Sequence, residues 1–192
     1  MRRSRLLVLI AVGAAVVGFA IASAAERVRG SKSEPAASEP APVQDAKLNW
    51  HETLGPAGEQ LQFGVVRFQV VPDGWRARVS VTNHSNVAFD LQKPHRSFGL
   101  MLFSSGKHED LTQRNGSSTL PPVRPALTYD PPLPDVLEPD KTWGGTMSAP
   151  GALAAGSWVR IVFGAFEAIG RAPDAFNGTL VWITDHAYHL ER

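Results

Sequence analysis

The sequence contains no cysteine and has little net charge, and each absence excludes a class of protein. Its 192 residues include 19 Lys and Arg and 18 Asp and Glu, for a formal net charge of +1. Without cysteine there is no disulfide scaffold, thiolate metal site, cysteine nucleophile or lipidated-cysteine anchor. A dedicated nucleic-acid-binding protein normally carries a basic excess. We therefore expect no nucleic-acid partner and a fold held together by core packing alone.

Helical periodicity is scarce after residue 50, whereas glycine and proline are abundant. The chain has 17 Gly and 15 Pro. This composition favours a loop-rich all-β chain over a helical bundle. The length allows one domain with extensions.

The N-terminal residues 1–25 have the pattern of a signal peptide or signal-anchor helix. Arg2, Arg3 and Arg5 precede an uncharged run from residue 6 to residue 25. Such a run spans about 30 Å as a helix, the thickness of a bilayer core, and the basic cluster predicts a cytoplasmic N-terminus. Ala22-Ser23-Ala24 also fits a cleavage site. We expect membrane contact through residues 6–25, and either a single-pass protein with an extracytoplasmic C-terminal domain or secretion after cleavage near Ala24.

The rest of the chain divides into a linker and a domain. Residues 26–48 are rich in Pro, Ser and Ala and contain no aromatic residue, which predicts a disordered linker. Composition changes at Leu48-Asn49-Trp50, so we place one domain at residues 49–192. Beyond the first 24 residues the chain holds 16 basic and 18 acidic residues, a net charge of −2. We therefore expect only the N-terminal segment to be attracted to anionic surfaces.

The domain shows the period-two alternation of half-buried strands. Trp75, Ala77, Val79 and Val81 alternate with polar residues, and the apolar parity switches at Val65-Val66, which predicts a β-bulge. Pro72-Asp73-Gly74 has the order of a tight turn. The stretches 98–103 and 158–166 are apolar on both parities, as in central strands. We expect strands at 61–71, 75–82, 87–91, 98–103, 143–147, 158–166 and 179–190. About seven strands with turns between them predict an antiparallel, immunoglobulin-like β-sandwich.

Two stretches carry a family resemblance. W-R-A-R-V-S-V-T-N-H-S-N-V-A-F, residues 75–89, resembles the strand–turn–strand opening of bacterial exported immunoglobulin-like domains, including the DUF4352-like group. L-E-P-D-K-T-W-G-G-T-M, residues 137–147, is similar to their turn-plus-strand pattern, with Asp140 where glycine is usual. The resemblance implies an immunoglobulin-like sandwich, and it implies no particular chemistry.

Motifs for catalysis or cofactor binding are missing. There is no G-x-S-x-G, no phosphate-binding P-loop and no G-x-G-x-x-G. On an extended strand His186 and His189 would face opposite sides, so they would not share a metal. We assign no catalytic, cofactor-binding or metal residue and expect no cofactor. A metal or small-ligand carrier that uses histidines from loops and strands stays open as an alternative; its candidates are His84, His95, His186 and His189.

The long segment 107–136 and two tryptophans are the places where the sequence suggests function. Seven of the 19 residues from 121 to 139 are proline, and a loop this long is often functional. We expect its exposed groups to include Arg114, Arg124 and Tyr129. Trp75, Trp158 and Trp182 are expected in the core. Trp50 and Trp143 fit either exposed binding platforms or the edge of the core.

These observations predict a non-enzymatic binding or interaction module of the cell envelope. Its partner would be an envelope protein or polymer, engaged through loops or a free sheet edge. A hydrolase whose site is built by the long loop is a second alternative.

Overall fold

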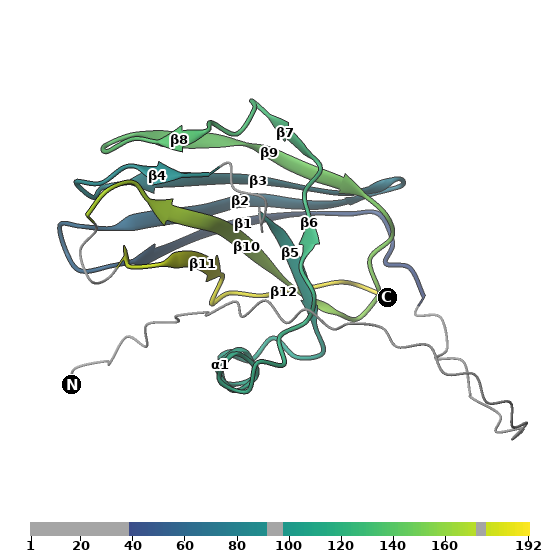
Figure 1. Ribbon diagram of the computed structural model, residues 1–192. Helices are drawn as coiled ribbons and strands as arrows, with labels where there is room; N and C mark the ends of the chain where they lie inside the picture. The colour runs from purple at the N-terminus through teal and green to yellow at the C-terminus, as the bar shows by residue number, and fades with distance from the viewer. Residues whose placement is uncertain (1–38, 92–97, 172–175) are drawn as a thin grey trace, which may run out of the picture.

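The computed structural model describes residues 39–91, 98–171 and 176–192 (Figure 1). The expected N-terminal segment 1–25, most of the expected linker and His95 lie outside these residues. Within the described part of the chain, no helix combines the length and apolar character needed to cross a membrane.

Two antiparallel sheets form a sandwich. The first has the strand order β1-β2-β3-β9-β7. Its strands are β1 (Gln44–Leu54), β2 (Leu61–Val71), β3 (Gly74–Asn83), β9 (Thr142–Pro150) and β7 (Thr128–Asp130). The second has the order β6-β5-β10-β4-β8, with β11 and β12 also paired to β10. Its strands are β4 (Phe89–Asp90), β5 (Gly99–Phe103), β6 (Arg124–Pro125), β8 (Val136–Leu137), β10 (Trp158–Ala168), β11 (Thr179–Ile183) and β12 (Tyr188–His189).

The main core lies between the sheets and is rich in aromatic rings. Phe63 and Phe68 of β2 face Phe163 and Phe166 of β10, and all four are at most 2% exposed. The Phe63 ring centroid lies 5.0 Å from that of Phe163, within the range of favourable aromatic pairs. Because this core is continuous across both sheets, the two halves stabilise each other without a disulfide.

A third layer covers the outer side of the second sheet. The helix α1 (His108–Gly116) lies beyond β5 and β10, on the side away from β1, β2 and β3 (Figure 1). Its Leu111 packs with Met101, Phe103 and Val162 in a second apolar cluster. This layer explains why residues 98–103 and 158–166 are apolar on both parities, since one set faces the main core and the other faces α1.

Several sequence predictions are confirmed. The expected alternation appears in β3, where Trp75 and Val79 are buried and Arg76 and Arg78 are exposed. The predicted bulge is present as a register shift between Val65 and Arg67. Residues 72–73 form the predicted turn between β2 and β3. Within the described residues, seven strands have five or more residues, and the others are two or three residues long.

Other predictions need correction. β1 begins at Gln44, so it crosses the boundary placed between residues 48 and 49, and the end of the expected linker belongs to the sandwich. The expected single strand 179–190 is divided into β11 and β12, because residues 184–187 leave the ladder to contact β1 and α1. The segment expected to be a loop contains α1. A helix was not expected after residue 50 because α1 carries a single buried apolar residue, Leu111.

Candidate functional site

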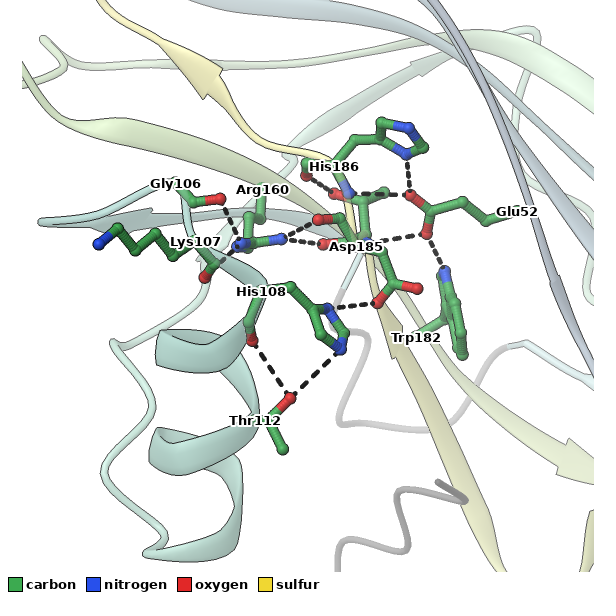
Figure 2. Close-up of polar contacts among 10 residues, drawn as sticks. Glu52, Gly106, Lys107, His108, Thr112, Arg160, Trp182, Asp185 and His186 are labelled. Carbon is green, nitrogen blue, oxygen red and sulfur yellow. Dashed lines mark hydrogen bonds and ion pairs between the residues drawn. The ribbon is translucent and has the colours of Figure 1, made fainter. Parts of the chain in front are cut away.

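A buried arginine is the centre of the polar cluster shown in Figure 2. Arg160 of β10 has no exposed surface, and its guanidinium donates hydrogen bonds to four main-chain carbonyls. Nη1 bonds the oxygens of Thr184 at 2.7 Å and Asp185 at 2.5 Å. Nη2 bonds those of Gly106 and Lys107, each at 3.0 Å. One side chain therefore fastens the segment before α1 to the segment after β11.

The environment of Arg160 suits a structural role. Burial lowers the pKa of its guanidinium, and the nearby Asp185, Glu52 and Asp110 carboxylates act in the opposite direction. An arginine stays protonated in proteins, so the four carbonyls receive charge-assisted bonds. The group also lies over the Phe103 ring, 5.4 Å from its centroid. A buried charge that is hydrogen-bonded in this way rigidifies its surroundings.

Glu52 of β1 is the second buried charge of the cluster. Its carboxylate accepts hydrogen bonds from Trp182 Nε1 at 2.7 Å, from Asp185 N at 2.9 Å and from His186 N at 3.1 Å. His186 Nδ1 lies 2.7 Å from the same carboxylate, and the His186 ring stacks on Trp50. Glu52 therefore holds residues 182–186 against the edge of the first sheet. The sequence analysis missed Glu52 because it did not recognise β1.

Thr112, His108 and Asp185 form a chain that superficially resembles a catalytic triad. His108 Nδ1 lies 3.3 Å from Asp185 Oδ1, and Thr112 Oγ1 lies 3.3 Å from His108 Nε2. The Thr112 hydroxyl also donates to the carbonyl oxygen of His108, one helical turn earlier. The chain therefore holds the first turn of α1 in place.

The pKa of Asp185 reflects the same crowding. Burial raises the pKa of its carboxyl, and the Glu52 carboxylate raises it further. His108, Arg160 and His186 act in the opposite direction. The ionised carboxylate of Asp185 is therefore less favourable in the folded protein than in the unfolded chain.

The histidines named as candidates for a metal site lie apart where the structure describes them. His186 contacts Glu52, His189 packs on Trp158 with ring centroids 4.7 Å apart, and His84 lies in the turn after β3. Within residues 39–91, 98–171 and 176–192, no three His, Asp or Glu side chains are grouped to hold a metal ion.

Of the groups expected to be exposed on the long segment, Arg124 is exposed, whereas Arg114 and Tyr129 are partly buried. Arg114 pairs with Asp110 at 3.0 Å, and Arg124 donates to the carbonyl oxygen of Ala152. Tyr129 packs edge-on against Phe98. Because α1 and its neighbours cover an apolar sheet face, this segment completes the fold. Deletion of this segment would therefore expose that face.

The burial of the tryptophans differs in part from the expectation. Trp75 is buried as expected, whereas Trp158 and Trp182 are only partly buried. Trp143 is 5% exposed and donates its indole N–H to the carbonyls of residues 131 and 132, so it is no exposed platform. Trp50 is partly buried beside His186.

The outer face of the first sheet is the main open, charged surface of the described sandwich. Lys47, Arg67 and Arg78 are direct cross-strand partners on β1, β2 and β3, and all three are exposed. Arg76 is exposed on the same face, one pleat along β3. We call these four residues the basic face. Although the chain beyond residue 24 has a net charge of −2, four positive side chains gather on this face. That only the N-terminal segment is attracted to anionic surfaces stays a prediction.

The basic face is only partly neutralised. Arg67 binds the Asp45 carboxylate through Nε and Nη2, and this contact lowers the pKa of Asp45. Lys47 and Arg78 form no ion pair with any described residue. Like charges directly opposite each other destabilise a sheet. Asp45 in turn raises the pKa of Arg67, so the repulsion at Arg67 is offset by this ion pair, and Arg78 is the neighbour without one among the described residues.

A hollow lies beside the basic face. Its volume is about 380 Å³, and Val66, Arg78, Ser80, Thr146 and Asp130 are among the residues that line it. Two glycines of β9, Gly144 and Gly145, are among the residues that line it, and the absence of their side chains leaves this part of the surface open. A Cβ on Gly144 would lie 3.7 Å from the Cβ of Ser80. This volume falls in the range of small-ligand sites, about 300–1,000 Å³.

Comparisons with known proteins identify no relative of this chain. No family model, curated protein or solved structure matches the chain.

Proposed function

We propose that the protein is a non-enzymatic, immunoglobulin-like interaction module of the cell envelope that binds a negatively charged partner with its basic face. Residues 6–25 hold the domain at the membrane, or the domain is released after cleavage near Ala24. The partner is an envelope protein or polymer. The resemblance of residues 75–89 and 137–147 to exported immunoglobulin-like domains supports this location in the cell envelope.

The observation that carries the proposal is the contrast between the two outer faces of the sandwich. The outer face of the second sheet is apolar and covered by α1. The outer face of the first sheet carries Lys47, Arg67 and Arg78 side by side. Arg67 is held by Asp45, whereas Lys47 and Arg78 beside it form no ion pair with a described residue, and such like charges side by side are expected where they bind something else.

The polar cluster of Figure 2 supports a non-enzymatic role. Its guanidinium and the Glu52 carboxylate bond main-chain groups of the same chain, so they position loops. The histidine candidates are dispersed where the structure describes them. Neither the metal-carrier nor the hydrolase alternative gains an observation in its favour.

Because the chain lacks cysteine, single cysteines test the proposal cleanly. Val66 is 43% exposed beside Arg67 and Arg78, so Val66→Cys reports on the basic face. Gln113→Cys on the exposed side of α1 is the matched control. Each is labelled with a membrane-impermeant maleimide in intact cells and in purified protein.

The proposal predicts labelling of both cysteines in intact cells, which requires an extracytoplasmic domain. It also predicts slower labelling of Val66→Cys in cells than in purified protein, with no such difference for Gln113→Cys. Failure to label either cysteine in cells would contradict export. Equal protection of both, or of neither, would contradict the assignment of the basic face as the interaction surface.

A further inference from the structure

We infer that the partner of the basic face is an acidic polysaccharide, an inference that rests on the proposed function. The face combines three properties that such a chain would satisfy together. It has a row of positive charges, a surrounding field of hydroxyl and amide groups, and a hollow beside the row.

The charge row determines the anionic part of the ligand. Lys47, Arg67 and Arg78 lie on three neighbouring strands. Strands in a sheet are about 4.8 Å apart, so the row spans about 10 Å of surface. Arginine presents a planar fork that matches carboxylate groups, and Arg78 has no such partner among the described residues. Arg67 already binds Asp45, so Lys47 and Arg78 on either side of it are the groups left for ligand carboxylates. A linear ligand with repeated carboxylates fits this spacing.

The neighbouring positions determine the uncharged part of the ligand. On the same face, Thr82 pairs with Thr142, Ser80 with Gly144, and Arg78 with Thr146 across β3 and β9. Gln62 and Gln69 of β2 lie opposite Thr82 and Arg76. Hydroxyl and amide groups both donate and accept hydrogen bonds, as a polyhydroxylated sugar chain requires. The hollow beside Arg78 and Ser80 is also lined by the exposed Asp130, so it suits the hydroxyl groups of a sugar ring, with the ring's carboxylate directed to the cations.

The same face fits other polyanions less well. Phe63, Phe68, Trp75 and Trp143 are buried in the core, and Trp50 of β1 is partly buried against it and stacks on His186. The four long strands of this sheet therefore place no Phe, Tyr or Trp beside Lys47, Arg67 and Arg78. Single-stranded nucleic acid is usually bound by stacking on such rings. Protein interfaces are usually centred on aromatic or other large apolar anchors, and Val66 is the exposed large apolar residue of this face.

The test uses the full chain in a non-ionic detergent and measures its affinity for polygalacturonate. Dextran serves as the neutral sugar, polyglutamate as the acidic polypeptide and an oligo-thymidylate as the nucleic acid. The row variant is Lys47→Gln with Arg67→Gln and Arg78→Gln. The matched control, Lys107→Gln with Arg124→Gln and Lys141→Gln, removes the same charge from exposed positions outside the basic face. Arg78→Gln alone serves if the row variant does not fold.

We expect polygalacturonate to bind more tightly than the other three probes and to lose affinity as salt is added. The row variant should lose about tenfold or more in affinity, and the control variant less than about twofold. Equal binding of polyglutamate or oligo-thymidylate, or equal losses in both variants, would overturn the inference. If polygalacturonate does not bind while Val66→Cys is protected from labelling in cells, the assignment of an acidic polysaccharide is wrong and the proposed function stands. If polygalacturonate does not bind and Val66→Cys is not protected, the basic face is no interaction surface.

Discussion

Replacing Arg160 with methionine should destabilise the protein strongly, because one side chain connects two otherwise separate segments. The change removes hydrogen bonds to the carbonyl oxygens of Thr184, Asp185, Gly106 and Lys107. Methionine keeps an unbranched apolar side chain, so the loss of stability comes mainly from removal of the charged guanidinium and its hydrogen bonds.

The size of the effect follows from the number and setting of these bonds. A hydrogen bond to a charged group contributes about 1.5–3 kcal/mol, and removal of one partner of a buried charged interaction costs about 3–5 kcal/mol. Three of the four contacts are only partly buried, so water can replace part of the loss. We expect Arg160→Met to lower the free energy of unfolding by about 3 kcal/mol, a large share of a typical total of about 5–15 kcal/mol.

Urea unfolding followed by tryptophan fluorescence measures this difference, and hydrogen exchange shows where protection is lost. Exchange should accelerate first in α1 and in residues 184–190. Arg124→Met is the control, because Arg124 is exposed and donates one hydrogen bond, to Ala152. A loss for Arg160→Met no larger than that for Arg124→Met would refute the idea that the guanidinium fastens the two segments.

Three further changes test the fold and the polar cluster. Val79→Asp should unfold the domain, because it places a charge at a position that is 2% exposed, whereas Arg78→Asp on the opposite side of β3 should leave the circular dichroism spectrum unchanged. Leu111→Ala should cost about 2–3 kcal/mol in urea unfolding by weakening the contact between α1 and the second sheet, with Gln113→Ala near zero; equal values would contradict that packing. Because the pKa of Asp185 is raised in the folded protein, its protonated carboxyl favours folding. This contribution to the free energy of unfolding is present at pH values below the usual pKa of an aspartate and is lost as the pH rises through the raised pKa. Asp185→Asn should therefore stabilise the protein more at pH 7 than at pH 3, and the opposite trend in pH-dependent melting would contradict the stated cause.

The strands that alternate cleanly could be predicted from the sequence. β3 and the bulge in β2 follow from period-two patterns that local residues impose. β1 was missed for two reasons. Its inward residues include Gln44 and Glu52, which are not apolar, and a register shift between Lys47 and Trp50 interrupts its alternation. Asn49 has a positive φ of 52° at this irregularity, a conformation that asparagine tolerates better than most residues.

The polar cluster and the basic face depend on contacts that the sequence does not reveal locally. Arg160 stands in an apolar strand, and a buried charge there signals that partners must exist, yet those partners lie more than 20 residues away in either direction. In the same way, the exposed side of β3 predicts that Arg78 faces outward. Its position beside Arg67 and Lys47 depends on the register of three strands and on two irregularities in that register.

The unfolding free energy of Arg78→Gln, measured together with its affinity for polygalacturonate, tests the central claim most directly. Arg78 lies opposite Arg67 and has no ion pair among the described residues, so its charge should cost stability by about 0.2–1 kcal/mol. The account predicts that Arg78→Gln is at least as stable as the natural protein, with the gain shrinking at high salt, and that it binds the polyanion more weakly. A variant that is less stable and binds as tightly as before would show that Arg78 serves the fold and that the basic face is no interaction surface.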